Sequence, residues 1–298
     1  MNTASQTHDP VDITRSKLPE ITLAFWIMKI CATTLGETAG DLLSMTLKIG
    51  YAASSVLLVG LFLVTLGAQL RSRAYHPLLY WTVILSTSTA GTTLSDFMDR
   101  TLGLGYATGS AILAGLLGAV LLYWKLSRKS LSIARVRGGQ GELLYWGAIL
   151  AGLLGAVLLY WKLSRKSLSI ARVRGGQGEL LYWGAILVSN TLGTALGDFL
   201  ADSSGLGFAG GALLIAGIIA LIAAAYYFTG LSRVALFWMA FVLTRPLGAT
   251  AGDLLTKPVS AGGLNLGTAG ASLVLLAVLL ATVGHASWQA RRVSLRSA

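Results

Sequence analysis

The sequence predicts an all-α, polytopic transmembrane helical bundle, and three observations lead to this fold class. Of the 298 residues, 54% are hydrophobic and only 12% are charged. Several apolar runs are about 20 residues long, which is the length at which a helix crosses a bilayer. A tryptophan also precedes an aspartate by 15 residues at four places, which indicates an internal repeat. We therefore expect an eight-span repeat core, together with one extra hydrophobic helix.

The hydrophobic spans follow one another along nearly the whole chain. They are expected near residues 20–43, 49–70, 77–98, 105–124, 142–161, 179–200, 206–228, 233–255 and 262–284. Together they form a single transmembrane domain, 19–284, between a polar N-terminus, 1–18, and a basic C-terminal tail, 285–298. The N-terminal residues contain no apolar core followed by a cleavage site, so the first span is expected to serve as its own signal anchor.

The net charge of +11 comes from basic residues that lie between the hydrophobic spans. In a membrane protein such residues favour cytoplasmic loops, so they indicate topology and not a nucleic-acid partner. An eight-span chain would place its basic segments and both termini in the cytoplasm, and the expected partner is the lipid bilayer. Nothing in the sequence sets an oligomeric state.

Each repeat is a two-helix unit, with a tryptophan early in its first helix and an aspartate late in it. The pairs are Trp26 and Asp41, Trp81 and Asp96, Trp183 and Asp198, and Trp238 and Asp253. An aromatic residue precedes each tryptophan, and a glycine stands five residues before each aspartate. The second helix of each unit is plain and apolar. The repeats are expected at about 19–72, 77–130, 179–230 and 232–284.

The chain resembles a known family at its four acidic motifs. These motifs are ICATTLGETAGD, STSTAGTTLSD, VSNTLGTALGD and LTRPLGATAGD. The family consists of uncharacterised bacterial inner-membrane proteins that are built of four tandem two-helix repeats, each with a characteristic tryptophan. The resemblance covers nearly the whole chain and implies an eight-span bundle in a bacterial inner membrane. It supplies no established activity, so the function has to be argued from the residues.

A second repetition is of a different kind. Residues 111–147 recur without a single change in residues 148–184, which indicates a very recent duplication or an artefact of sequence assembly. The copy adds the hydrophobic segment 142–161, which is expected to form a ninth helix between two identical basic segments. A single crossing by this helix would invert the third and fourth repeats, against the distribution of basic residues. The aspartates of those repeats would then lie at the opposite membrane face from the other two.

The acidic motifs place polar residues four apart, and such positions share one face of a helix. Counting back by four and by eight residues from each aspartate gives Glu37 and Thr33, Thr92 and Ser88, Thr194 and Asn190, and Ala249 and Arg245. This polar stripe is expected to face the interior of the bundle. The motif glycines form a small-xxx-small ridge beside it, which lets neighbouring helices approach closely. Packing alone would be a sufficient role for these glycines.

The carboxylates of the motifs are candidate ligands for a cation. The candidate metal ligands are Glu37, Asp41, Asp96, Asp198 and Asp253, supported by the polar groups of Thr33, Ser88, Thr92, Asn190 and Thr194. Hard oxygen ligands of this kind suit Mg²⁺, Mn²⁺, Ca²⁺ or protons. Lys29 and Arg245 would serve as internal counter-charges. The single cysteine, Cys31, and the three histidines outside the motifs argue against a soft or histidine-based metal site.

Simpler interpretations of the same residues stay open. Each aspartate could lie at the outer membrane interface, where it is hydrated and helps to end its helix. Lys29 could extend its ammonium group to the cytoplasmic interface. Against the interfacial interpretation of the aspartates stands the cost of a carboxylate in a membrane, which is about 2.5 to 3.5 kcal/mol at a helix centre. All four repeats carry an aspartate at the same position, so this cost would arise four times.

These residues favour a transporter or exporter that binds an inorganic cation at an acidic intramembrane site. Neither enzymatic activity nor a cofactor is expected. Two alternatives come from other classes. One is a non-transporting membrane scaffold or partner-binding protein, and the other is an intramembrane aspartyl protease whose paired acids share a proton.

Overall fold

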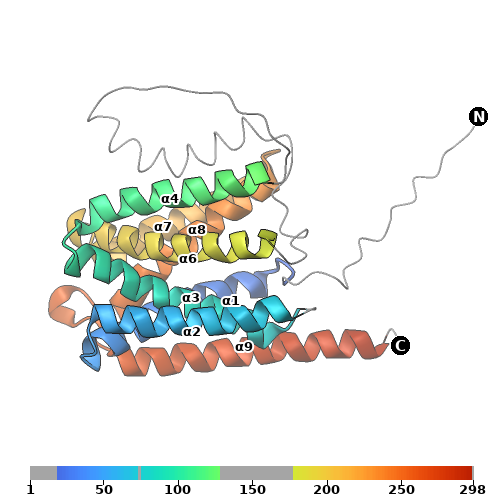
Figure 1. Cartoon of the computed structure of the whole chain (residues 1–298), viewed down its shortest axis with the longest axis horizontal. Helices are drawn as coiled ribbons and strands as arrows, with labels where there is room; N and C mark the ends of the chain where they lie inside the picture. Colours follow the sequence, from blue (N-terminus) through green and yellow to red (C-terminus); the bar gives the residue numbers. More distant parts are fainter. Residues whose placement is uncertain (1–18, 73–74, 128–176, 297–298) are drawn as a thin grey trace, which may run out of the picture.

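The computed structural model describes residues 19–72, 75–127 and 177–296, and these residues form helices and short connections, with no strand among them (Figure 1). Their eight long helices are α1 (Leu23–Asp41), α2 (Tyr51–Arg71), α3 (Pro77–Asp96), α4 (Gly105–Ser127), α6 (Gln177–Asp198), α7 (Gly207–Phe228), α8 (Arg233–Thr256) and α9 (Thr268–Arg296). The all-helical class and the two-helix unit are therefore confirmed.

Four of these helices form a closed inner ring. α1 packs against α3, α3 against α6, α6 against α8, and α8 against α1. These helices run in the same direction, because their aromatic ends meet at one end of the ring and their aspartates lie at the other. At the aromatic end, for example, the hydroxyl groups of Tyr80 and Tyr182 are 2.9 Å apart. At the other end, Arg100 reaches from the end of α3 to Asp198 on α6.

The second helix of each repeat packs outside the ring, against the first helix of the next repeat. α2 lies on α3, α4 on α6, and α7 on α8, and α9 closes the circle by lying on α1. The second helix of a repeat therefore packs mainly on the first helix of the next repeat and not on the first helix of its own repeat. Since a single unit of this kind cannot bury its own polar helix, the four repeats stabilise one another as a ring.

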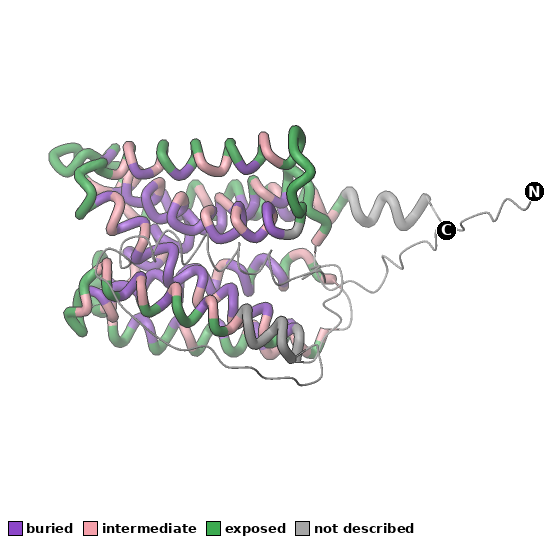
Figure 2. Tube along the Cα trace, turned by 90° about the horizontal axis from the view of Figure 1, so that it is seen from above, coloured by how far each residue is buried: buried purple, intermediate pink, exposed green. Residues whose placement is uncertain are grey.

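The apolar surface of the protein lies on the outer helices. Exposed residues gather on them and on the connections, whereas the inner helices are mostly buried (Figure 2). Val56 on α2 is 76% exposed, and Leu213 on α7 is 74% exposed. Within the described residues, four helices are long and apolar enough to cross a membrane: Tyr51–Arg71, Glu179–Ser203, Gly207–Phe228 and Thr268–Trp288. Such a surface fits contact with lipid, because lipid requires no polar groups on the outside.

Three inner helices continue past their aspartates in a π-helical turn. These turns are η2 (Leu42–Thr46), η3 (Phe97–Thr101) and η5 (Phe199–Ser203). α8 ends differently, because Pro258 follows Lys257, which adopts an extended conformation with φ −68° and ψ 154°. The residue before a proline prefers that conformation. A short 3₁₀ turn, η6 (Val259–Ala261), follows.

The helices agree with the expected spans to within a few residues, except at the C-terminal end. α9 begins at Thr268 and not at residue 262, because Gly262, Asn265 and Gly267 adopt positive φ values of 84°, 58° and 69°. The same helix then runs on to Arg296, through most of the segment that was expected to be a basic tail.

The structure describes the two ends of the duplicated region, up to residue 127 and from residue 177. The expected ninth helix, 142–161, lies outside the described residues. The repeats on either side are not inverted, since α3 and α6 run in the same direction and carry Asp96 and Asp198 at the same end of the ring. The four motif aspartates therefore stay together.

Candidate functional site

The interior of the ring is built in layers, because residues four apart on the four parallel helices face one another. At the aromatic end, each aromatic residue that precedes a tryptophan contacts the tryptophan of the next repeat. The ring centroids of Phe25 and Trp81 are 5.7 Å apart, those of Tyr80 and Trp183 5.6 Å, those of Tyr182 and Trp238 6.3 Å, and those of Phe237 and Trp26 5.5 Å. This cyclic packing explains why each motif begins with two aromatic residues.

The motif glycines bring the inner helices into close contact. A Cβ atom added at Gly36 would lie 2.4 Å from Cβ of Ser88, and one added at Gly248 would lie 2.8 Å from Cβ of Thr33. At Gly91 the nearest atoms belong to Asn190, at 3.0 Å. The predicted ridge of small residues therefore exists, and each glycine lies under a stripe residue of a neighbouring helix. The stripe itself is buried, as the sequence indicated: Thr33, Ser88, Thr92, Asn190, Thr194 and Arg245 are all inaccessible or nearly so.

Arg245 joins the four inner helices. It belongs to the polar stripe and lies on the side of the aspartates that faces the aromatic end of the ring. From α8, its Nη2 atom donates a hydrogen bond to Glu37 Oε2 at 2.9 Å and to Thr194 Oγ1 at 2.6 Å. It also contacts Thr92 Oγ1, and its Nη1 atom donates to the carbonyl oxygen of Thr33 at 3.3 Å. The whole residue is 0% exposed. The expected counter-charge role of Arg245 thus takes the form of a buried ion pair with Glu37.

Two further basic side chains hold the aspartates in pairs. Arg100 lies 3.0 Å from Asp96 and 3.4 Å from Asp198. Lys257 lies 2.9 Å from Asp41 and 3.1 Å from Asp253. The side chain of Arg100 is 33% exposed and that of Lys257 is 23% exposed, whereas the four aspartates and Glu37 are at most 7% exposed. The basic groups therefore lie between the acids and the solvent.

The electrostatics of Lys257 follow from this position just beyond α8. Burial by itself would lower the pKa of its ammonium group. The carboxylates of Asp253 and Asp41 outweigh burial and raise that pKa above its usual range. Lys257 therefore remains charged over the whole physiological pH range.

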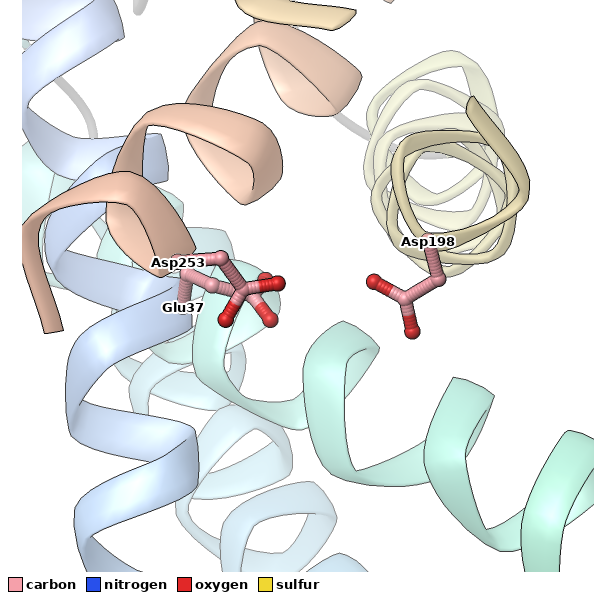
Figure 3. Close-up of side chains that lie close together, drawn as sticks. All are labelled: Glu37, Asp198 and Asp253. Carbon is pink, nitrogen blue, oxygen red and sulfur yellow. The ribbon is translucent and has the colours of Figure 1, made fainter. Parts of the chain in front are cut away.

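Three carboxylates converge at the centre of the ring, from three different repeats. One oxygen each from Glu37, Asp198 and Asp253 lies within 4.8 Å of the others, and all three residues are buried. Figure 3 shows them pointing toward one another from α1, α6 and α8. Three oxygen atoms at this separation could share one hard cation after a small adjustment of the side chains.

Lys29 lies deeper in the ring, away from the carboxylates. It is 0% exposed, and its Nζ atom lies 4.3 Å from the ring centroid of Phe241. No hydrogen-bond acceptor for this nitrogen is present among the described residues. The amino group is thus enclosed by the helices of the ring, and none of the described carboxylates forms an ion pair with it.

The structure divides the predicted site residues into distinct groups. It brings Glu37, Asp198 and Asp253 together. Asp41 and Asp96 lie outside this group of three and are joined to it through Lys257 and Arg100. Asn190 donates from Nδ2 to Thr87 Oγ1 at 2.9 Å and so supports the contact between α3 and α6. The Oγ atom of Ser88 has no hydrogen-bond partner in the described part of the chain.

Arg100 and Lys257 were missed by the sequence analysis. Each follows a motif aspartate by four residues, which places acid and base on one helical face. That spacing was the signal that could have identified them.

Comparison with known proteins identifies the repeat. No curated protein and no solved structure matches the chain. A family described as a repeat of unknown function, DUF347, matches four tandem stretches, residues 24–75, 79–130, 181–232 and 236–292. The second and third stretches are separated by the duplicated residues, which explains their wider spacing. Because these matches cover more than half of the chain, this protein belongs to the DUF347 family.

Proposed function

We propose that the protein is an eight-span transporter of an inorganic cation in a bacterial inner membrane, and that the cation binds at the carboxylates inside the ring. The observation that carries this proposal is the convergence of Glu37, Asp198 and Asp253 within 4.8 Å, in a fully buried position. Buried carboxylates are costly, and their usual reason in a membrane bundle is an ion or proton pathway.

The charge of the interior supports the same proposal. Five buried carboxylates have three direct basic partners, Arg245, Arg100 and Lys257, whereas Lys29 lies deeper in the ring and contacts none of them. Two carboxylate charges therefore lack a direct basic partner when all groups are ionised. A bound divalent cation would neutralise both. The ligands are oxygen atoms, which favours Mg²⁺, Mn²⁺ or Ca²⁺ over soft metals.

The alternatives receive less support from the geometry. An aspartyl protease needs two acids that share a proton, whereas two pairs of motif aspartates here, Asp96 with Asp198 and Asp41 with Asp253, each enclose a basic side chain. A scaffold protein would have no need of a buried cluster with unbalanced charge. No described feature outside the ring points to a partner protein.

Uptake by proteoliposomes tests the proposal. The purified full chain should transport at least one ion of a panel of Mg²⁺, Mn²⁺ and Ca²⁺. Asp41→Asn and Asp198→Asn should abolish transport without reducing the amount of folded protein, because asparagine keeps the shape of aspartate but not its charge. Asp202→Asn is the matched control, since Asp202 is an exposed acid close to the same end of α6. Wild-type uptake by both site variants would overturn the cation site.

A further inference from the structure

Arg100 and Lys257 occupy equivalent places in two repeats. Each follows the aspartate of its own repeat by four residues, and each also contacts the aspartate of the next repeat around the ring. The equivalent positions of the first and third repeats hold Met45 and Asp202, which are exposed and carry no positive charge. Basic residues therefore alternate with other residues around the ring. They bridge the α3–α6 and α8–α1 contacts at the acidic end.

These two residues differ from Arg245 in their freedom to move. Arg245 is 0% exposed and is held by polar groups on three other helices. Lys257 and Arg100 are partly exposed and lie beyond the last turn of their α-helices. Lys257 has a flexible stem and a compact charge, so its ammonium can turn from the carboxylates toward solvent when another cation takes its place.

We propose that Lys257 and Arg100 are tethered competitors of the transported ion, an inference that rests on the proposed function. In the absence of the ion, each side chain occupies one of the three converging carboxylates, Asp253 for Lys257 and Asp198 for Arg100, together with a neighbouring aspartate. An arriving divalent cation displaces the side chains toward solvent, and their return expels the ion. The ammonium of Lys257, at 2.9 and 3.1 Å from its two acids, makes the charge-assisted contacts of an ion pair with both, and so neutralises carboxylates that a cation would otherwise neutralise.

This role gives the basic residues a defined effect on affinity and on release. While Lys257 stays in place, its ammonium repels a cation bound at the cluster, because the two positive charges are a few ångströms apart in a poorly solvated site. Removal of that charge should strengthen binding and, at the same time, remove the group that helps to release the ion. A purely structural ion pair would not produce this combination.

The experiment measures Mn²⁺ binding and Mn²⁺ transport for the same variants of the full chain. Binding is followed in detergent by the electron paramagnetic resonance signal of free Mn²⁺, and transport by uptake into proteoliposomes. Lys257→Gln should bind Mn²⁺ at least about ten-fold more tightly, since it removes a nearby like charge. Its uptake at saturating Mn²⁺ should fall by a similar factor. Lys257→Arg should stay close to wild type, because it keeps the charge.

Lys48→Gln is the control for a general loss of positive charge, since Lys48 is exposed and lies near the same end of the bundle. It should leave affinity and uptake unchanged. Arg100→Gln makes the equivalent change in the second repeat and should show the same combination, which keeps the test open if Lys257→Gln does not fold. If both glutamine variants fold and bind Mn²⁺ with unchanged or weaker affinity, this inference is overturned, whereas the proposed function is not. Absence of saturable Mn²⁺ binding and of uptake by the wild-type protein would overturn the proposed function and this inference with it.

Discussion

The contact between α1 and α3 is close enough that one methyl group at Gly36 should destabilise the ring. A Cβ atom there would lie 2.4 Å from Cβ and Oγ of Ser88 and 3.0 Å from its backbone carbonyl carbon. Carbon atoms in favourable contact are about 3.5 to 4.0 Å apart, so the two helices would have to separate by about 1 Å. Rotation of the Ser88 side chain cannot relieve this overlap, because Cβ and the backbone are part of it.

The magnitude follows from two opposing effects. Overpacking costs about 1 to 3 kcal/mol, and alanine in place of glycine in a helix gains up to about 1 kcal/mol. Gly36→Ala should therefore lower the free energy of unfolding by about 1 to 2 kcal/mol. Thermal unfolding in detergent, followed by tryptophan fluorescence, measures this change. Gly60→Ala on α2 is the control, since no atom lies within 4 Å of the added Cβ. If Gly36→Ala is as stable as Gly60→Ala, the close-packed ring is wrong.

Three further predictions concern the buried charges and the duplication. Lys29→Met should raise the unfolding temperature by a few degrees, because it replaces a buried amino group that has no hydrogen-bond acceptor by an apolar side chain of similar length. A lower unfolding temperature would show that Lys29 has a partner. Arg245→Gln should instead lower the free energy of unfolding by about 3 to 5 kcal/mol, since it leaves the carboxylate of Glu37 buried without the guanidinium that pairs with it. A decrease of less than about 1 kcal/mol would contradict the importance of this ion pair. Deletion of residues 111–147 should retain the ring with both termini on the cytoplasmic side and raise transport, as checked by cysteine accessibility at Ser204 and Ala298. Unchanged sidedness together with lower transport would show that the duplicated segment is useful to the protein.

Much of the ring was predictable, because the information that defines it is local and repeated. The constant spacing of 15 residues between tryptophan and aspartate predicted that one inner helix of each repeat contains both residues. The polar residues at Thr33 and Glu37, and at Ser88 and Thr92, then indicated which face is buried. Glycine at the same place in each motif predicted the close contacts. Each of these signals depends only on helical geometry within one repeat.

The rest depends on contacts between repeats, which the spacing within one repeat does not specify. The apolar faces of the outer helices are alike, so the sequence does not tell that α2 covers α3 and not α1. The pairing of Lys257 with Asp41 depends on the closure of the ring between the last repeat and the first. Likewise, the meeting of Glu37 with Asp198 and Asp253 requires the first, third and fourth repeats to be parallel. The duplicated segment made that orientation uncertain at the level of sequence.

The most direct test of the central claim is the position of a bound cation. Crystals of the full chain grown or soaked with MnCl₂ would be measured at the manganese absorption edge, and an anomalous difference map would locate the ion. We predict one peak inside the ring with oxygen atoms of Glu37, Asp198 and Asp253 about 2.0 to 2.6 Å away, the range of hard cations bound to oxygen. Lys257 should have moved away from Asp253 in the same crystals. Saturating Mn²⁺ that leaves the cluster without a peak, or that binds only at the surface of the protein, would contradict the account.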